Sequence, residues 1–179
     1  MVKPGLTTRV EGNSATTMGE QPFETFVDRL DYPMFIVTAS AGDEISGCLV
    51  GFATQASIDP PRFLVGLSPN NHTFAVAREA THLGVHLVSR DDVELARWFG
   101  SETGDRMDKF GRHRWHRGPA STPILDAAPA WFVGKILDRF DFGDHVGHLL
   151  QPVDGHAPEG RPDWVTFTDV KDVEPGHQA

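Results

Sequence analysis

Short apolar runs, each ended within a few residues by a turn or a proline break, are the feature that most restricts how this chain can fold. Three such runs lie at 34–39, 45–52 and 63–67. The residues at 41–44 between the first two runs are turn formers. The Asp-Pro-Pro at 59–61 interrupts the chain before the third run, because proline has no N–H to donate to a strand ladder. Runs of this length and spacing predict three strands that form an antiparallel meander.

The rest of the chain offers more strands than helices. Apolar residues at i, i+3, i+4 and i+7 predict a short amphipathic helix at 23–30, and two further short helices are expected at 74–80 and 91–98. Further strands are expected at 83–88, 130–137 and 145–153, with a last edge strand at 164–167, whereas 111–122 is polar and is expected to be a loop. Because no regular long helices separate the strands, a doubly wound parallel sheet is disfavoured. The pattern predicts a mostly β fold, namely a small antiparallel barrel with peripheral helices.

The length of 179 residues is typical of one domain. We expect a flexible N-terminal tail at 1–20, one domain at 21–170 and a flexible C-terminal tail at 171–179. The formal net charge of −9 argues against nucleic acid and anionic membranes as partners, because both attract basic surfaces. Cys48 is the only cysteine, so no disulfide can form within the chain, which is typical of a reducing compartment. With no apolar stretch near the ~20 residues of a membrane helix and no secretory signal, a cytoplasmic location is expected.

Several possible catalytic or metal-binding patterns are weak on inspection. His145 and His148 are three residues apart in an expected strand, so their side chains point to opposite faces. His113 and His116 are surrounded by arginines that would repel a cation. We therefore expect no metal site. The stretch 66–70 lacks the last glycine of a serine hydrolase elbow, and the apolar neighbours of Cys48 make an inert core thiol the better interpretation.

Two polar segments each allow a structural and a functional interpretation. Residues 68–73 connect a strand to a helix, where backbone N–H groups and the helix dipole favour an anion; the alternative is an ordinary capped helix, with Asn71 or Thr73 as the cap. The Gly143-Asp144-His145 turn is either a polar hairpin turn or the mouth of a site whose imidazole contacts a ligand. Spacing alone leaves both choices open.

Residues 46–67 and the Gly-Asp-His at 143–145 together resemble the flavin reductase-like domain family. The shared pattern is a glycine, a small and polar strand, a serine–aliphatic–Asp-Pro-Pro segment and a hydrophobic strand, followed much later by the Gly-Asp-His turn. The resemblance runs from about Pro22 to Val153. It implies an FMN-binding split β-barrel of the antiparallel, Greek-key type, forming a homodimer with the flavin near the subunit interface.

The resemblance also assigns expected roles to residues. The isoalloxazine ring would be lined by Leu49, Val50, Gly51, Phe52, Ala53 and Thr54, and the ribityl chain and phosphate would be held by Gly66, Leu67, Ser68, Pro69, Asn70, Asn71, His72 and Thr73. Gly143, Asp144 and His145 would face the nicotinamide nucleotide, with His145 as the catalytic residue that orients it. No lysine or arginine occurs in 68–73, so charge for the phosphate would come from His72, Arg78, Arg90 or the 106–109 stretch.

The function implied by this resemblance is hydride transfer from NADH or NADPH to FMN. The protein would be an oxidoreductase that supplies reduced flavin to a monooxygenase component. A first alternative is a non-catalytic FMN carrier or electron-transfer protein. It is favoured by the run Val146-Gly147-His148, where the family usually has an aromatic residue followed by glycine. A second alternative is a barrel that binds FAD or a deazaflavin, or that has lost flavin binding.

Overall fold

The computed structural model describes residues 20–101, 108–160 and 162–173 in two units, which divide after Leu30. The first unit contains helix α1 (Glu20–Val27). The tail expected at 1–20 lies outside the described residues except for Glu20, and so does 174–179 of the expected C-terminal tail. None of the described helices is long and apolar enough to cross a membrane.

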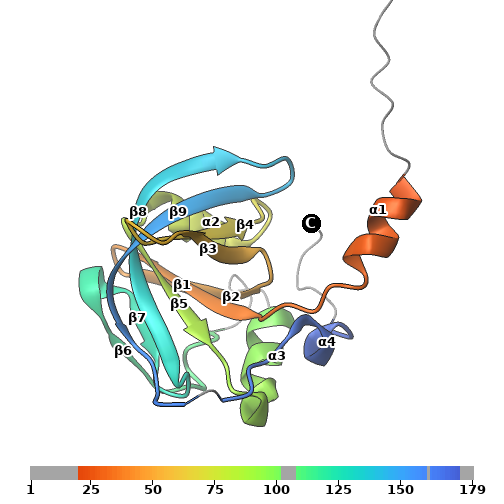
Figure 1. Cartoon of the computed structure of the whole chain (residues 1–179). Coiled ribbons are helices and arrows are strands. Elements are labelled where there is room, and N and C mark those ends of the chain that lie inside the picture. Colours follow the sequence, from red (N-terminus) through yellow and green to blue (C-terminus); the bar gives the residue numbers. More distant parts are fainter. Residues whose placement is uncertain (1–19, 102–107, 161, 174–179) are drawn as a thin grey trace, which may run out of the picture. The chain divides into compact units, whose positions relative to one another are not determined.

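The second unit is built around one antiparallel sheet of seven strands in the order β2-β1-β5-β8-β9-β4-β3 (Figure 1). These strands are β1 (Phe35–Ala41), β2 (Glu44–Val50), β3 (Ala53–Ser57), β4 (Arg62–Leu67), β5 (His82–Leu87), β8 (Ala130–Asp141) and β9 (Val146–His156). The edge strands β2 and β3 do not pair with each other, so the barrel is split. The predicted mostly β, antiparallel split barrel is therefore confirmed.

The hairpins follow from local sequence. Gly42 adopts a φ of +59° in the turn between β1 and β2, a conformation that glycine enters without steric cost. Gly143 adopts a φ of +113° between β8 and β9. Two register shifts bend the long β8–β9 hairpin, since each bulge kinks and twists its strand. The Gly-Asp-His turn therefore lies at the tip of a curved ribbon (Figure 1).

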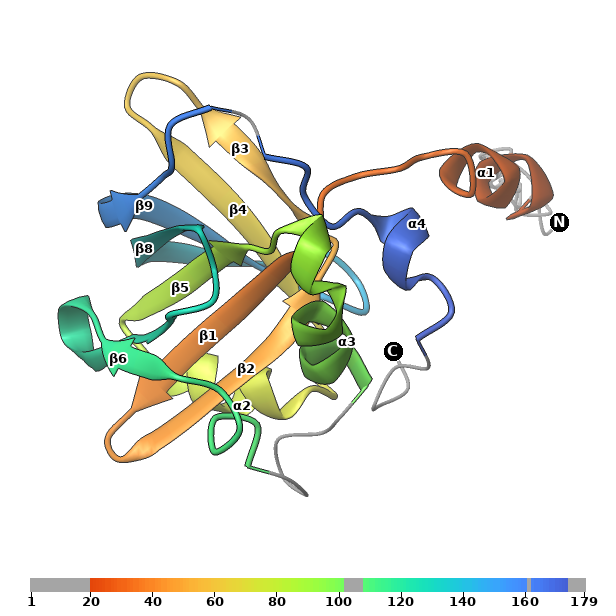
Figure 2. The same ribbon diagram turned by 90° about the horizontal axis from the view of Figure 1, so that it is seen from below.

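Both faces of the central strands are buried, which explains why β1 begins with three consecutive apolar residues, Phe35–Val37, instead of a strict alternation. On one face, Val37, Val65 and Leu150 pack with helix α2 (His72–Glu79). On the other face, Ile36 packs with helix α3 (Val93–Ser101) and the C-terminal segment. Figure 2 shows α3 beside β1 and β2, on the side where the chain returns to helix α4 (Phe167–Val170).

Three predictions about the strands are wrong. The runs at 34–39, 45–52 and 63–67 do not form a meander, because β4 pairs with β9 and with β3, a strand that was not predicted, and not with β2. The loop expected at 111–122 contains β6 (Trp115–Arg117), which pairs with β7 (Pro123–Leu125). In this short ribbon the Trp115 ring packs against Phe110. The edge strand expected at 164–167 makes only isolated bridges, and Phe167 begins α4. A capping box between Thr166 and Asp169 starts that helix.

Candidate flavin site

A pocket of about 290 Å³ opens where β2 and β4 end and the Gly-Asp-His turn returns. Its lining residues are Tyr32, Met34, Cys48, Leu49, Val50, Gly51, Phe52, Gly66, Leu67, Ser68, Asn71, His145 and Phe167. The fold thus brings together three segments that the sequence analysis singled out separately. The walls are mostly apolar, with the polar side chains of Ser68, Asn71 and His145 among them.

Two glycines let the walls of the pocket approach each other closely. A Cβ at Gly51 would lie 2.7 Å from Cε2 of Tyr32, and a Cβ at Gly66 would lie 3.2 Å from Cβ of Phe52. The Gly66 N–H also donates to the Phe52 carbonyl at 2.7 Å. At both positions any side chain would displace an aromatic residue that lines the pocket.

The α2 N-terminus at the edge of this pocket is capped by its own residues. Asn71 is the N-cap, and its Oδ1 accepts from the Thr73 N–H at 2.9 Å. Ser68 Oγ accepts from the Asn70 N–H at 3.3 Å. The Thr73 hydroxyl is buried and hydrogen bonds with that of Ser46 at 2.9 Å. Asn71 therefore serves as a cap while still lining the pocket.

Of the basic residues considered for a phosphate, Arg106 lies outside the described residues, and Arg78 lies 3.5 Å from its neighbour Glu79. The other three are engaged elsewhere. His72 lies 3.1 Å from a carboxylate oxygen of Glu44, and Arg90 pairs with Asp169. Lys109 is buried and donates to the Gly47 and Phe99 carbonyls at 3.1 and 2.9 Å. No lysine or arginine is among the described residues that line the pocket.

The Gly-Asp-His turn places one side chain in the pocket. His145 has a side chain only 17% exposed, and its ring meets Phe52 edge to face at 4.8 Å. Its Nδ1 lies 2.9 Å from Asp144 Oδ1, and this hydrogen bond lowers the pKa of the Asp144 carboxyl below its usual range. Asp144 thus contacts the pocket only through His145.

Eight of the expected site residues do not line this pocket: Ala53, Thr54, Pro69, Asn70, His72, Thr73, Gly143 and Asp144. Four lining residues were missed, namely Tyr32, Met34, Cys48 and Phe167. Of these four, only Cys48 lies within the motifs at 46–67 and 143–145 that carry the resemblance. Burial raises the pKa of the Cys48 thiol, as expected for an inert core cysteine.

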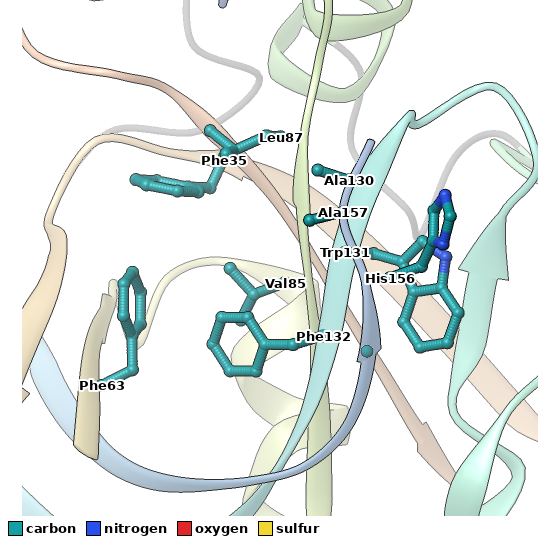
Figure 3. A pocket seen from close by; sticks show the side chains of 10 residues that line it. Phe35, Phe63, Val85, Leu87, Ala130, Trp131, Phe132, His156 and Ala157 are labelled. Carbon is teal, nitrogen blue, oxygen red and sulfur yellow. The ribbon is translucent and has the colours of Figure 1, made fainter. Parts of the chain in front are cut away.

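A second cavity of about 490 Å³ shares no lining residue with the first. Figure 3 shows Phe35, Phe63 and Phe132 around one apolar space, with Trp131 and His156 together to one side. The phenyl rings meet edge to face at 5.6 Å (Phe35–Phe63) and 5.2 Å (Phe63–Phe132). This nearly all-carbon lining offers little to the carbonyl, hydroxyl and phosphate groups of a flavin, so the first pocket is the better flavin site.

The architecture and the pocket define a class of protein, the antiparallel split barrel with a ligand pocket at the ends of β2 and β4. The family model for the flavin reductase like domain matches residues 27–170. The chain therefore belongs to the flavin reductase like domain family, as its sequence motifs predicted.

Curated relatives extend this finding. The chain is 29% identical over 119 residues to a stachydrine N-demethylase reductase subunit of Rhizobium meliloti, covering 64% of this chain and 50% of that protein. It is 25% identical over 150 residues to the reductase component of a 4-nitrophenol 4-monooxygenase/4-nitrocatechol 2-monooxygenase of Rhodococcus opacus, covering 84% and 79%. The chain thus spans about half the length of the first of these relatives.

Solved structures share the fold. An FMN-binding protein from Thermus thermophilus with bound p-hydroxybenzaldehyde superposes with a TM-score of 0.75 at 24% identity, covering 85% of this chain and 90% of that chain. A flavin reductase domain protein from Arthrobacter superposes with a TM-score of 0.72 at 24% identity, covering 83% and 95%.

Proposed function

We propose that this protein is an NADH- or NADPH-dependent flavin reductase that binds FMN and acts as a homodimer, as the reductase component of a two-component monooxygenase. The observation that carries the proposal is the pocket that joins 49–52, 66–68 and His145. Relatives named as reductase components of monooxygenases support the assignment.

The pocket lining fits a flavin. Leu49, Val50 and Met34 provide apolar surface for a planar ring, and Gly51 and Gly66 are positions where a Cβ would crowd the pocket walls. Ser68 and Asn71, beside the α2 N-terminus, provide polar contacts for the ribityl chain and the phosphate. A flavin held there would accept the hydride from the nicotinamide nucleotide and pass on its electrons.

His145 is the residue that we assign to positioning the nicotinamide nucleotide. Asp144 accepts a hydrogen bond from its Nδ1, which fixes the ring orientation and leaves Nε2 for a ligand. The edge-to-face contact with Phe52 further restricts the imidazole. The protein therefore acts by orientation and by excluding water, without a side-chain acid or base.

The test begins with the visible spectrum of the purified protein, followed by addition of FMN and then NADH or NADPH. A flavin spectrum with nucleotide oxidation supports the proposal, and a protein that does not bind FMN refutes it. H145A should lower kcat/KM for the nicotinamide nucleotide by about 10–100-fold with FMN affinity unchanged. H82A is the matched control, because His82 lies at the start of β5 and does not line the pocket. Equal kinetics in H145A and wild type would refute the role of His145.

A second candidate function is an FMN carrier or electron-transfer protein. It is favoured by the run Val146-Gly147-His148, which departs from the family pattern of an aromatic residue and a glycine after the Gly-Asp-His turn, and by the absence of lysine and arginine from the described lining. A pyrophosphate of a nicotinamide nucleotide would gain from such cations. FMN binding without nucleotide oxidation would support this function over the first.

A further inference from the structure

Two aromatic rings from distant parts of the chain form one wall of the flavin pocket. Tyr32 precedes β1 and Phe167 begins α4, and their rings stack with centroids 5.2 Å apart and planes 19° from parallel. Both line the pocket. Neither belongs to a segment that the family resemblance assigned to the flavin.

The backbone holds this ring pair in place. The Phe167 N–H donates to the Tyr32 carbonyl at 2.9 Å, and the Met34 N–H donates to the Val165 carbonyl at 2.9 Å. The Thr168 N–H donates to Asp31 Oδ1 at 3.0 Å. A wall that is ordered before a ligand arrives avoids the entropic cost of ordering it on binding.

The Tyr32 ring lies directly against the strand end assigned to the flavin ring. A Cβ at Gly51 would be 2.7 Å from Tyr32 Cε2 and 3.4 Å from its hydroxyl oxygen. Among the described residues none hydrogen bonds with this hydroxyl. Burial, together with the negative charge of Asp31, raises the pKa of Tyr32, so the phenol stays protonated and able to donate at neutral pH.

We propose that Tyr32 and Phe167 form the aromatic wall against which the flavin ring packs, and that the Tyr32 hydroxyl donates a hydrogen bond to an acceptor on that ring. The inference rests on the proposed function, since it requires a flavin in this pocket. Tyr32 is a binding residue in this scheme, and Phe167 positions it by stacking.

The pair can be tested by FMN binding to the full chain, followed through flavin fluorescence. Tyr32 is the only tyrosine in the sequence, and no tryptophan is among the described lining residues. A phenol against a flavin quenches its fluorescence by electron transfer. Bound FMN should therefore be quenched in wild type and brighter in Y32F, and Y32F should raise the Kd about fivefold through the loss of one hydrogen bond.

F167L should also raise the Kd for FMN, by about tenfold, because it removes the stacked ring. F132L is its matched control, since Phe132 lies in the second cavity and loses the same volume. Thermal unfolding without FMN shows whether each variant is folded. Equal FMN affinity and equal fluorescence in wild type, Y32F and F167L would overturn this inference and leave the proposed function standing. A wild-type protein that does not bind FMN would overturn both.

A measurement on wild type needs no variant. The ultraviolet absorbance of tyrosinate reports Tyr32 alone in the free protein, because there is no other tyrosine. With FMN added, a parallel titration of FMN is subtracted, since the flavin also absorbs and ionises at alkaline pH. Adding FMN should shift the Tyr32 titration to higher pH, since a hydrogen bond donated by the phenol stabilises its protonated form. An unchanged titration with FMN bound would overturn the inference.

Discussion

Protonation of one buried histidine should control how stability depends on pH. His86 in β5 is completely buried. Its Nδ1 donates to the Ile36 carbonyl at 3.0 Å, and its Nε2 accepts from the Leu125 N–H at 3.2 Å. Both nitrogens of the neutral ring are thus satisfied, whereas a proton on Nε2 would face an N–H. Burial is the main cause that lowers the pKa of His86 from 6.5 to about 4; the charge of His116 adds to it, and the Ile36 carbonyl opposes it.

The direction in which stability changes with pH follows from comparing the folded and unfolded states. The unfolded chain takes up the proton near pH 6.5, while the folded protein does so only near pH 4. Unfolding is therefore increasingly favoured as the pH falls through this window, and the effect levels off below it. At about 1.4 kcal/mol per pKa unit, the His86 contribution lost is about 2 kcal/mol between pH 7 and 5 and about 3 kcal/mol between pH 7 and 4.

Urea denaturation of wild type and H86N at several pH values measures this contribution. Asparagine offers a donor and an acceptor but does not titrate, so the free energy of unfolding of H86N should fall less, by about 2 kcal/mol, between pH 7 and 5. His148, whose pKa is also lowered by burial, is present in both proteins and cancels in the difference. H156N replaces an exposed histidine of β9 and should follow wild type. Parallel curves for wild type and H86N would refute the reasoning.

Three further predictions concern packing and ionisation. G84A should destabilise the protein by about 1–3 kcal/mol in urea denaturation, because its Cβ would meet the hydroxyl of Thr38, which is held by the Pro123 carbonyl at 2.7 Å; wild-type stability would contradict this. L150A should cost about 2–5 kcal/mol in the same assay, since Leu150 is fully buried in the barrel core, and a smaller loss would mean that the barrel collapses around the cavity. Absorbance titration of the single tyrosine should give Tyr32 a pKa above 10.0, because burial disfavours its anion; a value at or below 10.0 would contradict the burial of this ring.

Most strands of the sheet were predictable because they depend on local pattern. The runs at 34–39, 45–52 and 63–67 coincide closely with β1, β2 and β4. The sequence signals were short-range: apolar runs, glycines that permit positive φ, and prolines that interrupt ladders. The motifs at 46–67 and 143–145 also indicated the family before the fold was known.

Other features depended on partners far away in sequence. His72 was a candidate phosphate ligand, but the fold places it beside Glu44. Tyr32 lines the pocket with its ring stacked on Phe167, which comes from the C-terminal part of the chain. Neither contact can be predicted from local periodicity, since a window of neighbouring residues does not indicate which distant segment will pack against them.

By itself, the sequence of this protein determined six of the seven strands of the main sheet, their turns and the family, because φ preferences and apolar spacing act within a few residues. The tertiary structure alone decided which side chains share the pocket, how His145 is oriented and which histidines are buried. These properties depend on burial and on contacts between segments that only the closed packing of the sheet brings together.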